Sequence, residues 1–206
     1  IALMLEANPG LTWRDVQEIL VRTAARTDPE HPDWKLNGAG FYVNHDYGFG
    51  RPDAGAAVRL AQLWPGLPEE EEWMEASEAR SAIVPAGSPD GATLSLDVEK
   101  NLRLEHVQLS LELETPDWGA MDILLISPAG TESRLSLPFD TTSQPSGSAW
   151  LFNTVRHRGE SSSGRWRLRV ASRDPSVEGS ILSWALIFRG AAPDPFENPS
   201  PVPRID

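Results

Sequence analysis

Between residues 81 and 190, apolar residues recur at every second position, and this period constrains the fold more than any other feature of the sequence. In one run, Val107, Leu109, Leu111 and Leu113 alternate with polar residues. Successive side chains of a β-strand point to opposite faces, so this run predicts a strand with one apolar face. Further strands are expected over 94–98, 122–127, 149–155, 166–170 and 182–188.

Turns rich in Gly, Pro, Asn and Ser separate these runs, and no helical pattern intervenes. Short alternating strands of this kind predict antiparallel sheets packed face to face. We therefore expect an all-β antiparallel sandwich or jelly roll over residues 81–190. The tail, 191–206, contains too many prolines to fold alone and is predicted to be disordered.

The front of the chain follows a helical period instead. Residues 1–8 resemble the last turns of an apolar helix, which an Asn-Pro-Gly turn ends. Thr12 followed three residues later by Asp15 is a capping signature. Apolar residues at helical spacing behind it predict a helix over 13–25.

The helical period is lost over residues 26–50, where Pro, Gly, Asn and aromatic residues predict an irregular ordered loop or a short hairpin. Asp53 then caps a third helix, which completes a first region of residues 1–64. Residues 65–80 combine two prolines with six glutamates and one arginine, so we expect an extended acidic linker there.

Composition excludes several classes of function. The net charge is −12, which disfavours binding to nucleic-acid phosphates, because that binding needs clustered Lys and Arg. The chain contains no cysteine, so disulfides, thiolate catalysis and zinc fingers cannot form within it. The longest apolar run, Ile1–Leu5, is far too short to span a membrane.

No catalytic, cofactor-binding or metal-ligating residue is assigned from the sequence. The Gly-x-Ser-x-Gly elbow of serine hydrolases is absent, and the serine-rich stretch 159–164 fits a loop between strands. His31, His45, His106 and His157 stand at no metal-binding spacing. His45 beside Asp46 is the strongest pair, for which a structural hydrogen bond is favoured over catalysis.

Two further sets of side chains have alternative interpretations. Asp117, Asp122 and Asp140 could supply oxygen ligands to calcium, but they match no calcium-loop spacing, and solvated or turn-capping carboxylates are favoured. Among the eight tryptophans, those on predicted strands are expected in the core, and Trp118 in a turn is the candidate for a sugar platform. The strand tryptophans are Trp150, Trp166 and Trp184.

Two stretches of the first region carry a family resemblance: LMLEANPGLTWRDVQEILVRTA (Leu3–Ala24) and VNHDYGFGRPDAGAAVRLAQLW (Val43–Trp64). They resemble the end of the catalytic domain of subtilisin-type proteases of the kexin/furin branch. The resemblance implies that the catalytic serine stands just upstream of Ile1, with the catalytic Asp and His before it. His45 then corresponds to a structural position of the family.

The second region resembles the P domain that follows the catalytic domain in these convertases. The resemblance is carried by Arg103–Val107, by Asp122 with Ser127–Thr131, and by the pattern that includes Trp166, Leu168 and Val170. Arg158 is a departure, since relatives often carry tryptophan there. The resemblance implies a mixed chain: a helical remnant of an α/β subtilisin-like domain, followed by an all-β P domain.

The resemblance also implies what the whole protein does. It would be a secreted, extracellular, calcium-dependent serine endopeptidase that cleaves proteins or peptides after basic residues, with the calcium sites upstream of this chain. The P domain would pack on the catalytic domain and stabilise it, and this chain alone would be inactive. The alternative is a non-catalytic β-sandwich module that binds glycans or a protein partner.

Overall fold

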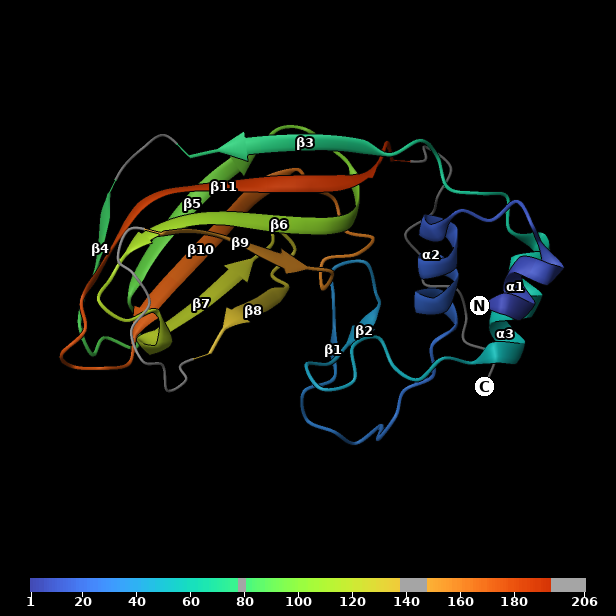
Figure 1. The fold of residues 1–206 in the computed structure, drawn as a ribbon, viewed down its shortest axis with the longest axis horizontal. Helices are drawn as coiled ribbons and strands as arrows, with labels where there is room; N and C mark the ends of the chain where they lie inside the picture. Colours follow the sequence, from blue (N-terminus) through green and yellow to red (C-terminus); the bar gives the residue numbers. More distant parts are fainter. Residues whose placement is uncertain (78–80, 138–147, 194–206) are drawn as a thin grey trace. The chain divides into compact units, whose positions relative to one another are not determined.

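A computed structural model of the protein describes residues 1–77, 81–137 and 148–193, which divide into two compact units (Figure 1). The first unit comprises Ile1–Glu69, and the second begins at Glu70. The boundary therefore falls inside the segment predicted to be a linker.

The first unit contains the three helices that the sequence predicts. They are α1 (Ala2–Ala7), α2 (Trp13–Thr23) and α3 (Ala54–Leu63). A capping box starts α2: the Thr12 hydroxyl accepts from the Asp15 amide at 3.2 Å, and the Asp15 carboxylate accepts from the Thr12 amide at 2.8 Å. Asp53 caps α3 by accepting from the Ala56 amide at 2.8 Å.

The core of this unit is small. It consists of five buried apolar side chains from the three helices: Met4, Val16, Ile19, Ala57 and Ala61. The segment between α2 and α3 is an irregular loop with a short antiparallel hairpin, β1 (Lys35–Leu36) and β2 (Tyr42–Val43), as expected.

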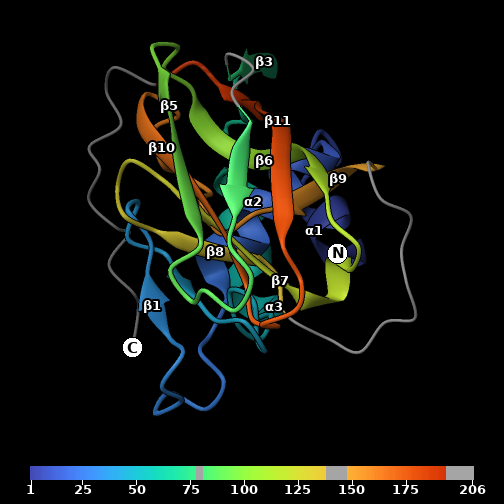
Figure 2. The same cartoon turned by 90° about the vertical axis from the view of Figure 1, so that its left-hand side faces the viewer.

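The second unit is a β-sandwich built of two sheets in which every pairing is antiparallel. The four-stranded sheet has the order β5 (Ala92–Val98), β10 (Gly164–Ser172), β7 (Met121–Ile126) and β8 (Glu132–Ser136). The other sheet has the order β3 (Glu71–Ala76), β11 (Gly179–Ala191), β6 (Arg103–Glu114) and β9 (Ser148–Thr154), with β4 (Ala82–Val84) paired to β11. Figure 2 shows β5 beside β10 and β6 beside β11.

The period-two prediction is confirmed by burial. The inward residues of β6, Val107 to Leu113, are at most 1% exposed, and those of β10 and β11 join them in one continuous core. Trp166 and Trp184 belong to that core, as predicted. Such a core removes far more apolar surface from water than the five side chains of the helical unit.

The acidic segment departs from the prediction, because its residues 71–76 form strand β3 instead of an unpacked linker. β3 pairs with β11, and two of its glutamates meet cations: Glu72 with Arg189 at 2.7 Å and Glu71 with Lys100 at 2.6 Å. These pairings reduce the repulsion on which the linker prediction rested. Of the predicted tail, Ala191 ends β11, and residues 194–206 lie outside the described residues.

Candidate functional site

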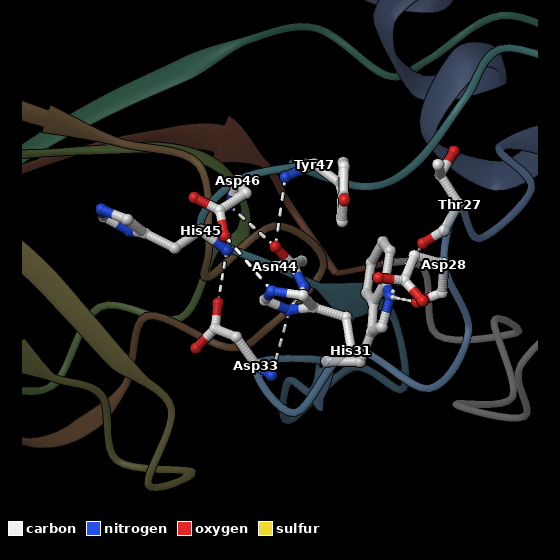
Figure 3. A network of polar contacts seen from close by, with 9 residues as sticks. Thr27, Asp28, His31, Asp33, Asn44, His45, Asp46 and Tyr47 are labelled. Carbon is white, nitrogen blue, oxygen red and sulfur yellow. Dashed lines mark hydrogen bonds and ion pairs between the residues drawn. The ribbon is translucent and has the colours of Figure 1, made fainter.

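The loop between α2 and α3 holds a network of polar contacts centred on His31 (Figure 3). The His31 Nδ1 lies 2.9 Å from the Asn44 side-chain nitrogen and accepts from the Asp33 amide at 3.3 Å. The His31 Nε2 lies 3.5 Å from a carboxylate oxygen of Asp46. The structure thus pairs Asp46 with His31, which lies fifteen positions earlier in the chain, and not with its sequence neighbour His45.

Further contacts of Asn44 and Trp34 hold the backbone of this loop. The Asn44 side-chain oxygen accepts from the amides of Asp46 and Tyr47 at 2.8 and 3.1 Å. The Trp34 indole donates to the carbonyls of Thr27 and Asp28, and its ring stacks on Tyr47 with centroids 6.1 Å apart.

The His45 ring points away from the network, while its backbone amide donates to the Asp33 carboxylate (Figure 3). Among the described residues, no serine or threonine hydroxyl is hydrogen-bonded to the His31 imidazole. A hydroxyl nucleophile needs such a partner to be activated. The network therefore orders a loop. It contains the His–Asp pair found in many hydrolase sites, but no hydroxyl nucleophile is bonded to that pair in the ranges that the structure describes.

The serine-rich stretch forms the loop before β10. The buried hydroxyl of Ser162 accepts from the Leu102 amide at 2.8 Å and donates to the Lys100 carbonyl at 2.6 Å. Ser161 donates to the Asn101 side chain at 2.8 Å. These hydroxyls tie the start of β10 to the start of β6, and their contacts are those of a structural loop.

Close to this loop lies a buried polar cluster of His157, Glu160 and Thr131. The Thr131 hydroxyl donates to Glu160, and the second Glu160 oxygen lies 3.8 Å from His157 Nδ1. The His157 ring also meets the Trp166 ring edge-on, with centroids 5.0 Å apart. Burial lowers the pKa of His157 to about 3, and the charge of Arg156 acts in the same direction. The imidazole is therefore neutral at physiological pH, and it is sealed from any substrate.

The aspartates weighed as calcium ligands lie in three different settings. Asp117 caps the short helix η1 (Trp118–Ala120) by accepting from the Gly119 amide at 2.8 Å. Asp122 is buried and pairs with Arg173 at 2.8 Å and Arg134 at 3.3 Å, so guanidinium groups occupy the oxygens that a cation would need. Asp140 lies outside the described residues. Within 1–77, 81–137 and 148–193, no three His, Asp or Glu side chains gather as a metal site would require.

Two tryptophans differ from their sequence interpretation. Trp150 was expected in the core but is 55% exposed, because β9 is an edge strand of its sheet. Trp118 packs against Phe152, and its buried indole nitrogen has no hydrogen-bond partner among the residues that the structure describes. A sugar platform needs an accessible ring with polar groups around it, so Trp118 does not favour the glycan-binding alternative.

Arg158, the departure from the convertase pattern, is 2% exposed. Its side chain is therefore buried, in the segment between β9 and β10. A long amphipathic side chain of this kind contributes packing as well as charge.

The comparisons with known proteins agree with this architecture. A family model described as the proprotein convertase P-domain matches residues 104–188. The human protein named proprotein convertase subtilisin/kexin type 6 is 36% identical over 208 residues, which cover 95% of this chain and 22% of that protein. The chain belongs to the proprotein convertase family. The PC3-like endoprotease variant B of Hydra vulgaris is 41% identical over 205 residues, covering 96% of this chain and 28% of that protein.

This convertase chain therefore spans about a quarter of the length of the curated relatives it matches. A crystal structure of the Aeromonas sobria serine protease in complex with a chaperone superposes with a TM-score of 0.84 at 23% identity. It covers 93% of this chain and 42% of the Aeromonas protein. That likeness extends over both units and establishes the fold. None of the helices in the described part of the chain is long and apolar enough to cross a membrane.

Proposed function

We propose that this chain is the C-terminal portion of a subtilisin/kexin-like serine endopeptidase. In it, residues 1–69 complete the protease domain and the sandwich stabilises that domain. The observation that carries the proposal is that convertases align with at least 95% of the chain, so that the helical unit and the P domain match in one continuous stretch.

The surface of the helical unit supports its assignment to a larger domain. Ile1 at the N-cap of α1 is 67% exposed, and Leu3 on α1 and Leu63 on α3 are 59% and 84% exposed. An amphipathic helix normally buries its apolar residues against a neighbour, and five core side chains are too few to stabilise a separate domain. The rest of a protease domain would bury these exposed apolar side chains.

The proposed role of the sandwich is to stabilise the folded protease domain by binding to it. The sandwich has a large core, and the buried hydroxyls of Ser162 and Thr131 are engaged in structural hydrogen bonds. Any surface that binds only the folded form of a protease domain stabilises that form by mass action. The intact enzyme would act on proteins or peptides after basic residues, outside the cell, with calcium bound by residues upstream of this chain.

The proposal requires this chain to be inactive alone, because the triad would lie upstream. Incubated with a chromogenic basic peptide, the isolated chain should release no product above background. Turnover that persists after Ser161, Ser162 and Ser163 are all replaced by alanine would contradict the missing triad while leaving the family assignment intact.

The stabilising role is tested in the complete gene product. Deleting the chain from Glu70 onward should lower the thermal midpoint of the protease domain and shorten the lifetime of its peptidase activity. A control deletion from residue 194 onward, which keeps β11, should change neither. Equal midpoints for the two deletions would refute stabilisation by the sandwich.

A further inference from the structure

The outer face of the four-stranded sheet carries a stripe of arginines. Trp166, Leu168 and Val170 of β10 point into the core and are 0% exposed, so Arg165, Arg167 and Arg169 project from the opposite face. A cationic stripe stands out on a chain whose net charge is −12.

One end of the stripe, Arg165, already pairs with a carboxylate, and a second carboxylate lies beyond the other end. Arg165 makes a bidentate pair with Asp97 of β5, at 2.9 and 3.0 Å. Beyond the other end, Arg173 and Arg134 both contact Asp122 of β7. The face thus binds carboxylates wherever the register supplies them.

The other two arginines of the stripe, Arg167 and Arg169, have no carboxylate among their strand partners. The strand partners of Arg167 are Ser95 of β5 and Ile126 of β7, and those of Arg169 are Thr93 and Leu124. Among the residues that the structure describes, neither guanidinium has an ion pair or a hydrogen bond to another side chain. Two cations therefore stand in line, with hydroxyl groups along one side and apolar side chains along the other.

The spacing of these two cations selects the shape of a ligand. Residues two apart on a strand are separated by about 6.6–6.8 Å, and an extended peptide repeats its same-side residues at the same distance. Arg binds carboxylates in a bidentate geometry that Lys does not reproduce. The net negative charge of the chain repels densely charged polyanions. A ligand of this face must therefore gain its affinity from carboxylates spaced to match the arginines, and not from long-range electrostatic attraction.

We propose that the outer face of β10 binds an extended polypeptide segment with acidic side chains at every second residue, which pair with Arg167 and Arg169. The hydroxyls of Thr93 and Ser95 lie in position to donate to the same carboxylates. The partner is a separate protein with an alternating acidic stretch, because the acidic strand β3 of this chain is already paired with β11.

The test uses fluorescence anisotropy of the whole chain at low ionic strength with two labelled peptides. In one peptide Glu and Thr alternate, and in the other the same residues are arranged in two blocks. The alternating peptide should bind more tightly, and its affinity should fall as salt rises. Replacing both arginines (Arg167→Ala with Arg169→Ala) should weaken its binding about tenfold, as expected for the loss of two exposed charge pairs.

Two control variants separate geometry from charge. Replacing Lys35 and Arg59, exposed cations of the helical unit, by alanine removes the same net charge and should leave the affinity unchanged. Replacing Arg167 and Arg169 by lysine keeps the charge and should give an intermediate affinity. Equal binding of the two peptides, or wild-type affinity in the alanine variant, would overturn the proposal. The proposal would also fail if binding of a heparin oligosaccharide required both arginines while binding of the two peptides did not.

Discussion

At the scale of single residues, Asp15 is the link between two helices of the first unit. Its buried carboxylate accepts from the Thr12 amide and hydroxyl, from the Trp64 indole at 2.7 Å and from the Leu67 amide at 2.7 Å. Burial acts to raise the pKa of Asp15, but these hydrogen bonds outweigh it and lower that pKa below its ordinary value. One side chain therefore caps α2 and fixes the segment that leaves α3.

We predict that Asp15→Ala destabilises the helical unit by about 3 kcal/mol, since it leaves several partly buried donors unpaired. Urea unfolding followed by far-UV circular dichroism, which reports the helices, measures the change. The matched control is Asp53→Ala, which removes an exposed cap and should cost about 1 kcal/mol. Because the pKa of Asp15 is lowered, the wild-type advantage should be complete above the ordinary pKa and decline as the pH falls through the lowered value. Equal losses of stability in the two variants would contradict the role of Asp15 in joining α2 to the segment that leaves α3.

His157 makes the stability of the sandwich depend on pH. Its pKa is about 3 in the folded chain and near the ordinary value of 6.5 in the unfolded chain. Below pH 6.5 the unfolded state takes up a proton that the folded state does not. Stability should therefore fall on acidification by about 1.4 kcal/mol per pH unit from this residue, until the pH approaches 3.

The variant His157→Leu should remove that component. Because neither ring nitrogen of His157 has a hydrogen-bond partner within the described part of the chain, an apolar replacement leaves no partner there unsatisfied. Urea midpoints of the sandwich at pH 7 and pH 5 should differ less in the variant than in the wild type. His45→Leu, at an exposed histidine, should keep the wild-type difference between the two midpoints. If His157→Leu also keeps that difference, the pH dependence does not come from His157.

At the scale of elements, Gly91 sets the close approach at the start of β5. Its φ is +57°, and a Cβ built there would lie 2.1 Å from the Val170 carbonyl oxygen of β10. We predict that Gly91→Ala lowers the stability of the sandwich by more than 2 kcal/mol, roughly the combined cost of left-handed backbone and a displaced strand. Gly130→Ala is the control, because Gly130 also has a positive φ but nothing lies within 4 Å of its Cβ. Chemical denaturation of both variants checks this, and equal losses would show that the contact with β10 is relaxed at no cost.

The elements also show what sequence alone could establish. The long central strands and the capped helices were predictable, because local periods and caps determine them. Strand β3 was not, since the arginine that offsets its Glu72 stands at position 189. The exposure of Trp150 was missed for a similar reason: an alternating pattern does not tell an edge strand from a central one. The His31–Asp46 pair was missed because a loop brings its members together.

At the scale of the whole molecule, the two units differ in how much apolar surface stabilises each of them. The sandwich holds a continuous core drawn from both sheets, whereas the core cluster of the helical unit has five buried apolar side chains, and several others in that unit are exposed. Regions with few buried apolar contacts open with a smaller free energy than a large core does. The two units should therefore exchange their amide hydrogens at very different rates.

We predict that peptides from α2 and α3 of the isolated chain exchange orders of magnitude faster than peptides from β6 and β11, as measured by hydrogen-exchange mass spectrometry. If the exposed faces of α1 and α3 are covered by the rest of a protease domain, the same helical peptides should become strongly protected in the complete gene product. Peptides from β6 serve as the internal reference, since their core lies within the sandwich. Helices already protected as strongly as β6 in the isolated chain would mean that the small core suffices, and the argument for a missing cover would fail. Helices unprotected in both forms would contradict a protease domain built on them.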